Sequence, residues 1–173
     1  LDLTAEVKVK YQEVYQHLRA AFPELKIILA NYFDCYGDNL DIALSLPVEA
    51  LHLDLGRCPS QLDDILAHPA LAHQALSLGL VDGRNIWKNN YQNSLTYIRK
   101  AMEKLGEEKV WLAPSCSLLH SPYDLDLEIQ LDPELKDWLS FGKQKLNELK
   151  GLKEIAMLPD SEHSLEYLKQ NKQ

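Results

Sequence analysis

The sequence has few cysteines and no long apolar run. Its cysteines, Cys35, Cys58 and Cys116, are an odd number in a chain of 173 residues, whereas a secreted disulfide framework shows an even set in a small, loop-rich chain. We therefore expect reduced thiols and a cytoplasmic protein. No apolar stretch reaches the roughly 18 residues that cross a bilayer, and no basic segment followed by an apolar one marks a signal peptide. We expect no membrane partner.

Positive charge is also scarce. Lys and Arg number 18 against 26 Asp and Glu, for a net charge of −8. Binding to a phosphate backbone needs clustered Lys and Arg, and no basic stripe occurs in the sequence, so we expect no nucleic-acid partner. The first residue is Leu1 rather than Met, which suggests a piece excised from something longer.

Several common site motifs are missing as well. No G-x-G-x-x-G follows an apolar run, so a dinucleotide-binding fold has no support. No C-x-x-C occurs, and the six histidines show neither H-E-x-x-H nor zinc-finger spacing. Short motifs of the sequence therefore identify neither a dinucleotide site nor a zinc site.

What the chain does contain is an alternation of strand-like and helix-like segments. Apolar runs of strand length occupy 26–30, 50–55, 76–81 and 110–113, and helical spacing or caps mark 3–22, 38–46, 60–67, 89–105, 132–150 and a segment from 161. The expected capping residues are Thr4, Ser60 paired with Asp63, and Ser161 or Ser164. This alternation predicts an α/β fold of four parallel strand–helix units with right-handed crossovers. The units form either an open sheet or half of a (β/α)8 TIM-type barrel. The half-barrel has two unpaired sheet edges, which favour a homodimer.

The strongest polar cluster follows the third apolar run. Asp82, Arg84 and Asn85 come directly after Val81, and ligands of α/β folds gather at the carboxyl ends of the strands. These three residues are therefore a candidate substrate-binding set that could clamp a polar ligand. The alternative is an internal Asp82–Arg84 salt bridge with Asn85 capping the turn.

A metal site and a nucleophile are two further hypotheses. Cys35, Asp54 and Cys116 lie at or beyond the ends of different strands, and three ligands suffice for a catalytic zinc. Without a nearby histidine, we favour buried, inert thiols and an acid that is either solvated or hydrogen-bonded. Cys116 with His120 could form a nucleophile and its base, although a structural cysteine is the simpler interpretation. His52, between two leucines, is interpreted as a packed, hydrogen-bonded histidine.

Three long motifs carry a family resemblance. LHLDLGR (51–57), LSLGLVDGRNIW (76–87) and VWLAPSCSLLHSPYDLDLE (110–128) resemble the amino-terminal domain of cobalamin-independent methionine synthase. The flanking segments fit the same pattern, so the resemblance covers nearly the whole chain. It implies an enzyme that transfers a methyl group from 5-methyltetrahydropteroyl-polyglutamate to homocysteine, with zinc activating the thiol. It also implies two (β/α)8 barrels, and residues 1–173 resemble the second half of the first one as a single unit.

The resemblance places the chemistry elsewhere. In the family the zinc ligands, the homocysteine pocket and most of the folate site belong to the carboxyl-terminal barrel, so no catalytic residue and no cofactor are expected in this chain. Phe33-Asp34-Cys35, Asp54 and Cys116 match the zinc-bearing positions of that barrel, but Phe cannot bind zinc, which makes the set a relic.

Two roles follow for this chain. As a fragment, it would be inactive alone and would support the interdomain surface and part of the mouth facing folate. Its partners would be the missing first half of the barrel and the catalytic barrel. The rival is a stand-alone half-barrel module that binds a ligand through Asp82, Arg84 and Asn85.

Overall fold

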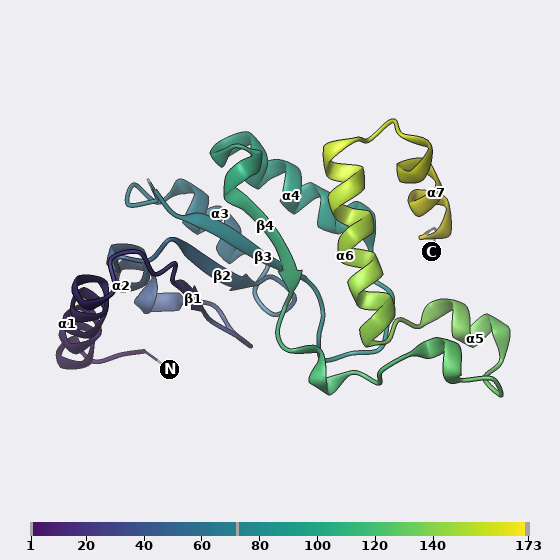
Figure 1. Cartoon of the computed structure of the whole chain (residues 1–173), viewed down its shortest axis with the longest axis horizontal. Helices are drawn as coiled ribbons and strands as arrows, with labels where there is room; N and C mark the ends of the chain where they lie inside the picture. Colours follow the sequence, from purple (N-terminus) through teal and green to yellow (C-terminus); the bar gives the residue numbers. More distant parts are fainter. Residues whose placement is uncertain (1, 72, 172–173) are drawn as a thin grey trace.

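The computed structural model describes residues 2–71 and 73–171. Its strands are β1 (Ile28–Ala30), β2 (Ala50–Asp54), β3 (Ala75–Val81) and β4 (Val110–Pro114). All pairs are parallel, and the strands lie in the order β1-β2-β3-β4 (Figure 1). Each apolar run of the sequence thus becomes a strand. The expected α/β fold is confirmed, and it is consistent with half of a (β/α)8 barrel.

Helices alternate with these strands. The helices are α1 (Ala5–Ala21), α2 (Leu40–Ser45), α3 (Gln61–Ala67), α4 (Tyr91–Leu105), α5 (Pro133–Trp138), α6 (Gly142–Met157) and α7 (Glu162–Gln170). Short 3₁₀ turns occupy Gly37–Asn39, Glu107–Lys109, Leu118–His120 and Leu125–Leu127. Within residues 2–71 and 73–171, no helix combines the length and the hydropathy that crossing a bilayer requires.

The side-chain caps are partly as predicted. Thr4 caps α1 by accepting a hydrogen bond from the backbone N–H of Val7, and Ser161 caps α7 in the same way from Ser164. Such caps satisfy backbone donors that have no partner inside the helix. The predicted cap at Ser60 is wrong, because its side chain makes no capping hydrogen bond to α3.

The single helix predicted over 132–150 is also wrong. The structure has α5 and α6, separated by Leu139–Phe141. The backbone N–H of Ser140 donates to the carbonyl oxygen of Ile86 at 2.7 Å, and that of Lys88 donates to Trp138 O at 3.0 Å. These long-range bonds form an isolated antiparallel bridge between Trp87 and Leu139. A backbone group that bonds to another segment is not available to a helix, so tertiary pairing overrides the local helical pattern.

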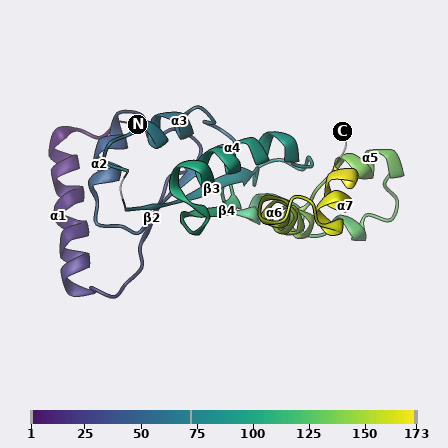
Figure 2. The ribbon, with the colours of Figure 1, turned by 90° about the horizontal axis from the view of Figure 1, so that it is seen from above.

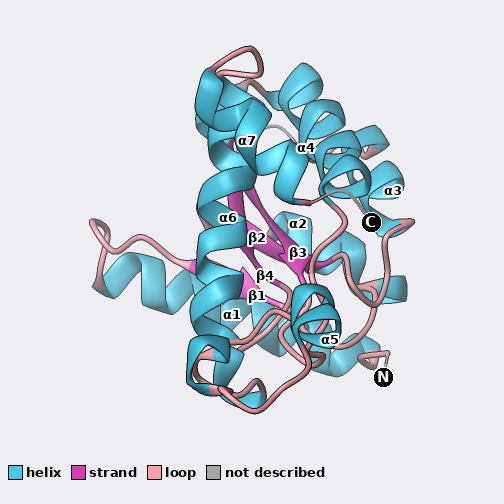
Figure 3. Ribbon diagram, turned by 90° about the vertical axis from the view of Figure 1, so that its right-hand side faces the viewer, coloured by secondary structure: helices cyan, strands magenta, loops and turns pink. Residues whose placement is uncertain are grey.

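The two faces of the sheet differ. One face, the covered face, presents Leu51, Leu53, Leu76 and Leu78, all with an exposed fraction of 0%. Figure 2 shows α2, α3 and α4 together on this side, and Figure 3 shows α3 and α4 along the same flank of the strands. The core of the described chain therefore lies between the sheet and these helices.

The opposite face, the open face, carries a mixture of small, polar and large apolar residues. Its middle row, in register across the strands, is Ala30, His52, Ser77 and Trp111. Between α1 and α6, no helix of the described ranges lies over this face in Figure 2. At its margins, Ile28 is 52% exposed and Trp111 39% exposed. The edge strands β1 and β4 each pair with one neighbour among the described strands.

Candidate functional site at the carboxyl ends of the strands

The loops that follow the strands form one connected edge, which we call the rim (residues 31–36, 54–60, 82–88 and 115–121). The loops after β3 and β4 are joined because the N–H of Gly83 donates to Ser115 Oγ at 3.2 Å and Ser121 Oγ donates to Gly83 O at 3.4 Å. A Cβ at Gly83 would lie 2.9 Å from the carbonyl oxygen of Cys116. Only glycine permits this approach without a shift of the backbone.

Asp82 organises the turn after β3. Its Oδ1 accepts the backbone N–H of Arg84 at 2.7 Å, and its Oδ2 accepts Nδ2 of Asn85 at 2.9 Å. Asn85 Oδ1 in turn accepts the backbone N–H of Trp87 at 3.1 Å. Asp82 and Asn85 are therefore engaged in the turn itself. Asx side chains commonly close turns in this way.

The side chain of Arg84 does not take part in this turn and contacts Phe33 instead. Its guanidinium carbon lies 4.8 Å from the centre of the Phe33 ring, a cation–π arrangement that joins the loops after β3 and β1. In the part of the chain that the structure describes, the ion pairs do not include Asp82 with Arg84. The salt bridge considered for this turn is thus not formed. Of the three candidate substrate-binding residues, Arg84 is the exposed one.

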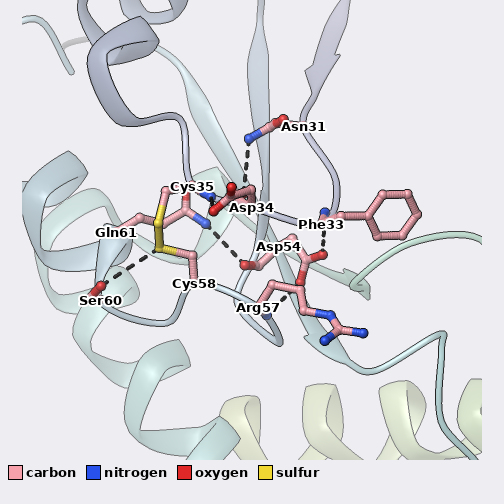
Figure 4. The surroundings of a disulfide bond; sticks show 9 residues. All are labelled: Asn31, Phe33, Asp34, Cys35, Asp54, Arg57, Cys58, Ser60 and Gln61. Atoms are coloured by element: carbon pink, nitrogen blue, oxygen red, sulfur yellow. Dashed lines mark hydrogen bonds between the residues drawn. A yellow bond between two sulfur atoms is a disulfide. The ribbon is translucent and has the colours of Figure 1, made fainter. Parts of the chain in front are cut away.

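Asp54 holds two rim loops together (Figure 4). It is 1% exposed, and its Oδ2 accepts the backbone N–H of Phe33 at 2.8 Å while its Oδ1 accepts that of Arg57 at 2.9 Å. Phe33 has a φ of 73°, a conformation that is unfavourable for an aromatic residue. A buried carboxylate needs such partners, and here both of its oxygens have them.

Two of the cysteines form a disulfide. Cys35, after β1, is bonded to Cys58, after β2, with a Cα–Cα distance of 5.3 Å (Figure 4). The expectation that every cysteine is a reduced thiol is therefore wrong for this pair. The sequence separation of 23 residues concealed it, because the two loops become neighbours only when β1 and β2 pair in parallel.

Cys116 is the free cysteine of the described chain, and it is buried. Burial raises the pKa of its thiol, and the nearby charge of Asp54 raises it further. A nucleophilic cysteine needs a lowered pKa, and His120 lies exposed at the end of its own 3₁₀ turn. The structure thus agrees with an inert, structural cysteine.

The donor set does not fit zinc. Cys35 is consumed by the disulfide, and Asp54 uses both oxygens on backbone N–H groups. Across residues 2–71 and 73–171, no group of three or more His, Cys, Asp or Glu side chains is placed to hold a metal ion. In this structure Cys35 and Asp54 each join two loops of the rim, and Cys116 is a buried thiol.

His52 lies at the centre of the open face. Its Nε2 lies 3.2 Å from the carbonyl oxygen of Ser115, and its Nδ1 lies 3.0 Å from Ser77 Oγ. Because a carbonyl only accepts, Nε2 donates to it, and in the neutral form of the ring Nδ1 is then the acceptor of the Ser77 hydroxyl. Burial lowers the pKa of this imidazole. His52 is therefore a packed, hydrogen-bonded histidine, as its position between leucines indicated.

A cavity of about 430 Å³ lies over this histidine. It is lined by Ile28, Ala30, Tyr32, His52, Ser77, Ala113, Pro114, Cys116 and Ser117. Its wall is mostly apolar, and the imidazole of His52 and the hydroxyl of Ser77 in that wall are bonded to each other.

Two buried charges on α6 were not singled out from the sequence. Lys145 is 1% exposed, and its Nζ reaches Asn85 Oδ1 at 3.3 Å and Trp87 O at 3.2 Å. Glu148 is also buried, and its Oε1 accepts the backbone N–H of Asn89 at 3.0 Å. Burial lowers the pKa of Lys145 and raises that of Glu148. The sequence feature that could have identified them is the spacing of Lys145, Glu148 and Leu152, which places all three on one face of the helix.

Comparison with known proteins matches this architecture to a family. Residues 1–106 match the family model described as the N-terminal domain of cobalamin-independent synthase. A relative from Flavobacterium johnsoniae is 56% identical over 90% of this chain, and one from Cytophaga hutchinsonii is 53% identical over 99% of it. A third, from Xylella fastidiosa, is 44% identical over 98% of the chain. Each is named 5-methyltetrahydropteroyltriglutamate–homocysteine methyltransferase.

These relatives are much longer than the present chain. The matched regions are 21%, 23% and 22% of their respective lengths. The chain therefore spans about a fifth of the relatives that it matches.

Proposed function

Since the chain belongs to the family of the N-terminal domain of cobalamin-independent synthases, we propose that it is part of a methyltransferase that moves the methyl group of 5-methyltetrahydropteroyl-polyglutamate to homocysteine. The observation that carries the proposal is the match of 56% identity over 90% of the chain to a relative with that name. We propose the cytoplasm as its location.

The part played by this chain is structural support. Its candidate metal-ligating groups are already engaged or buried: Asp54 accepts hydrogen bonds from two loops, Cys35 is in a disulfide, and the thiol of Cys116 is buried. In our proposal the chain is the second half of the N-terminal barrel, as one unit. The first half of that barrel covers the open face, and a catalytic barrel supplies the zinc and the homocysteine pocket.

An activity assay tests this role. The isolated chain is incubated with 5-methyltetrahydropteroyl-triglutamate, homocysteine and zinc, and methionine is measured. We expect no methionine above the level without protein. Methionine formation by the isolated chain would contradict a supporting role.

The alternative is a stand-alone binding module, and the exposed guanidinium of Arg84 favours it. Calorimetric titration with the folate polyglutamate distinguishes the two functions. A supporting fragment gives no heat of binding at micromolar concentrations. The binding module gives heat that Arg84→Ala removes and that Arg57→Ala, a change at another exposed rim arginine, leaves unchanged.

A residual zinc module is the third function to test. Its donors would be Cys35, Asp54 and Cys116. We expect no stoichiometric zinc after purification without chelator, because Cys35 and Asp54 have other partners. Elemental analysis that finds one zinc per chain would contradict this expectation.

The unpaired edges of β1 and β4 support self-association of the isolated chain. A strand edge presents backbone N–H and C=O groups that pair with another strand. We therefore propose a homodimer through these edges when the rest of the barrel is absent. Light scattering at increasing protein concentration tests it, and a monodisperse monomer at high concentration would contradict it.

A further inference from the structure

The disulfide of the rim has one accessible and one protected end. Cys35 is exposed, whereas Cys58 is 5% exposed. The bond joins the loops after two neighbouring strands, at the edge where the candidate site lies (Figure 4). Exposed disulfides are more readily exchanged than buried ones, because an attacking thiolate must reach a sulfur along the S–S axis.

We propose that the Cys35–Cys58 pair is a thiol–disulfide exchange site whose reagent is a small thiol of the glutathione class. The reagent thiolate attacks Cys35 Sγ, the S–S bond breaks, and Cys58 leaves as a thiolate that takes up a proton. A second reagent thiol then displaces Cys35 from the mixed disulfide. The protein disulfide gains two electrons, and the reagent ends as its own disulfide. The oxidised reagent drives the reverse reaction.

The surroundings of Cys58 suit a leaving thiolate. Ser60 Oγ lies 3.8 Å from Cys58 Sγ and can donate a hydrogen bond to the developing charge. The backbone N–H of Cys58 stays bonded to Asp54 O at 3.1 Å, and that of Cys35 to the side chain of Asp34 at 2.8 Å. The backbone N–H groups of both cysteines thus have hydrogen-bond partners in the disulfide form and in the reduced form.

Reduction removes one of two ties between these loops. The carboxylate of Asp54 remains as the other, because it holds the N–H groups of Phe33 and Arg57. Phe33 also carries the guanidinium of Arg84 above its ring. The redox state therefore sets how freely the loop after β1 moves, and through Phe33 it acts on Arg84. The inference does not depend on methyl transfer.

The test uses the full 173-residue chain in buffers of graded reduced and oxidised glutathione. Free thiols are trapped by alkylation, and the peptides are mapped by mass spectrometry. We expect Cys35 and Cys58 to change together, with a linked peptide at the oxidising end and two alkylated peptides at the reducing end. In Cys58→Ser, the mixed disulfide with glutathione should form on Cys35. In Cys35→Ser, the buried Cys58 should react far more slowly.

Either of two results would overturn the exchange site. One is a Cys35–Cys58 pair that stays alkylatable in the most oxidising buffer. The other is a linked peptide that survives excess reduced glutathione in the native protein. Cys116 is the internal control, because it is buried and should be alkylated only after unfolding.

Amide hydrogen exchange measures the effect on the loops without any substitution. We expect residues 33–36 and 56–58 to exchange on the order of tenfold faster after reduction, as local opening becomes easier, while β3 is unchanged. The double variant Cys35→Ser/Cys58→Ser should match the reduced protein under both conditions. Equal exchange before and after reduction would overturn the link between redox state and rim.

Discussion

The covered face and the open face of the same sheet are built on different principles. On the covered face, Leu51, Leu53, Leu76 and Leu78 are fully buried beneath helices of this chain. On the open face, the corresponding row includes His52 and Ser77, which are buried and hydrogen-bonded to each other, and His52 also bonds to the backbone. Helices of this chain therefore cover one face of the sheet, whereas no described helix between α1 and α6 lies over the other.

The two faces contribute differently to the stability of the fold and to the groups available for binding. Burial of apolar side chains is the largest favourable contribution to folding, and the covered face supplies it. The open face and the rim present the groups that could meet a ligand or another part of the protein.

The largest effect should come from the covered face. Leu78→Ala removes a fully buried side chain and should lower the free energy of unfolding by about 2–5 kcal/mol. Ile28→Ala on the open face, where the side chain is 52% exposed, should cost under about 1 kcal/mol. Urea denaturation of both variants measures the two losses of unfolding free energy. Equal losses would show that the two faces contribute alike.

The next effect concerns the rim, where the strands end. Asp54→Ala leaves the N–H groups of Phe33 and Arg57 without their charged acceptor and should cost about 1.5–3 kcal/mol. Asp54→Asn retains one acceptor oxygen and should cost less. Unfolding midpoints in urea measure both. If Asp54→Ala left the free energy of unfolding unchanged, the disulfide alone would hold the rim loops together.

The smallest effect is a pH dependence from the open face. Burial lowers the pKa of folded His52 below its ordinary value of 6.5, so the unfolded chain binds the proton first as pH falls. The stability from neutral His52 is therefore fully present above pH 6.5 and is lost as pH falls from there toward the folded pKa. His52→Gln should flatten this part of the profile. Denaturation at several pH values checks it, and parallel profiles for both proteins would contradict it.

Local pattern alone determined much of the architecture. Apolar runs of strand length predicted the strands, most clearly β3, whose seven residues are all buried. Thr4 and Ser161 marked helix starts, because an N-terminal cap is a local hydrogen bond. The long motifs around Asp54 and Asp82 gave the family. The position of the candidate site at the carboxyl ends followed from the parallel order.

Only the tertiary structure decided which distant residues contact one another. Cys35 pairs with Cys58 rather than joining Asp54 and Cys116 in one set, because neighbouring strands bring their loops together. Arg84 faces Phe33 instead of Asp82, since Asp82 is used by the turn. The break at 139–141 depends on hydrogen bonds to 86–88, more than fifty residues earlier in the chain. A sequence pattern reports which residues are buried, but a hydrogen bond, a ring contact or a disulfide requires two distant segments to meet.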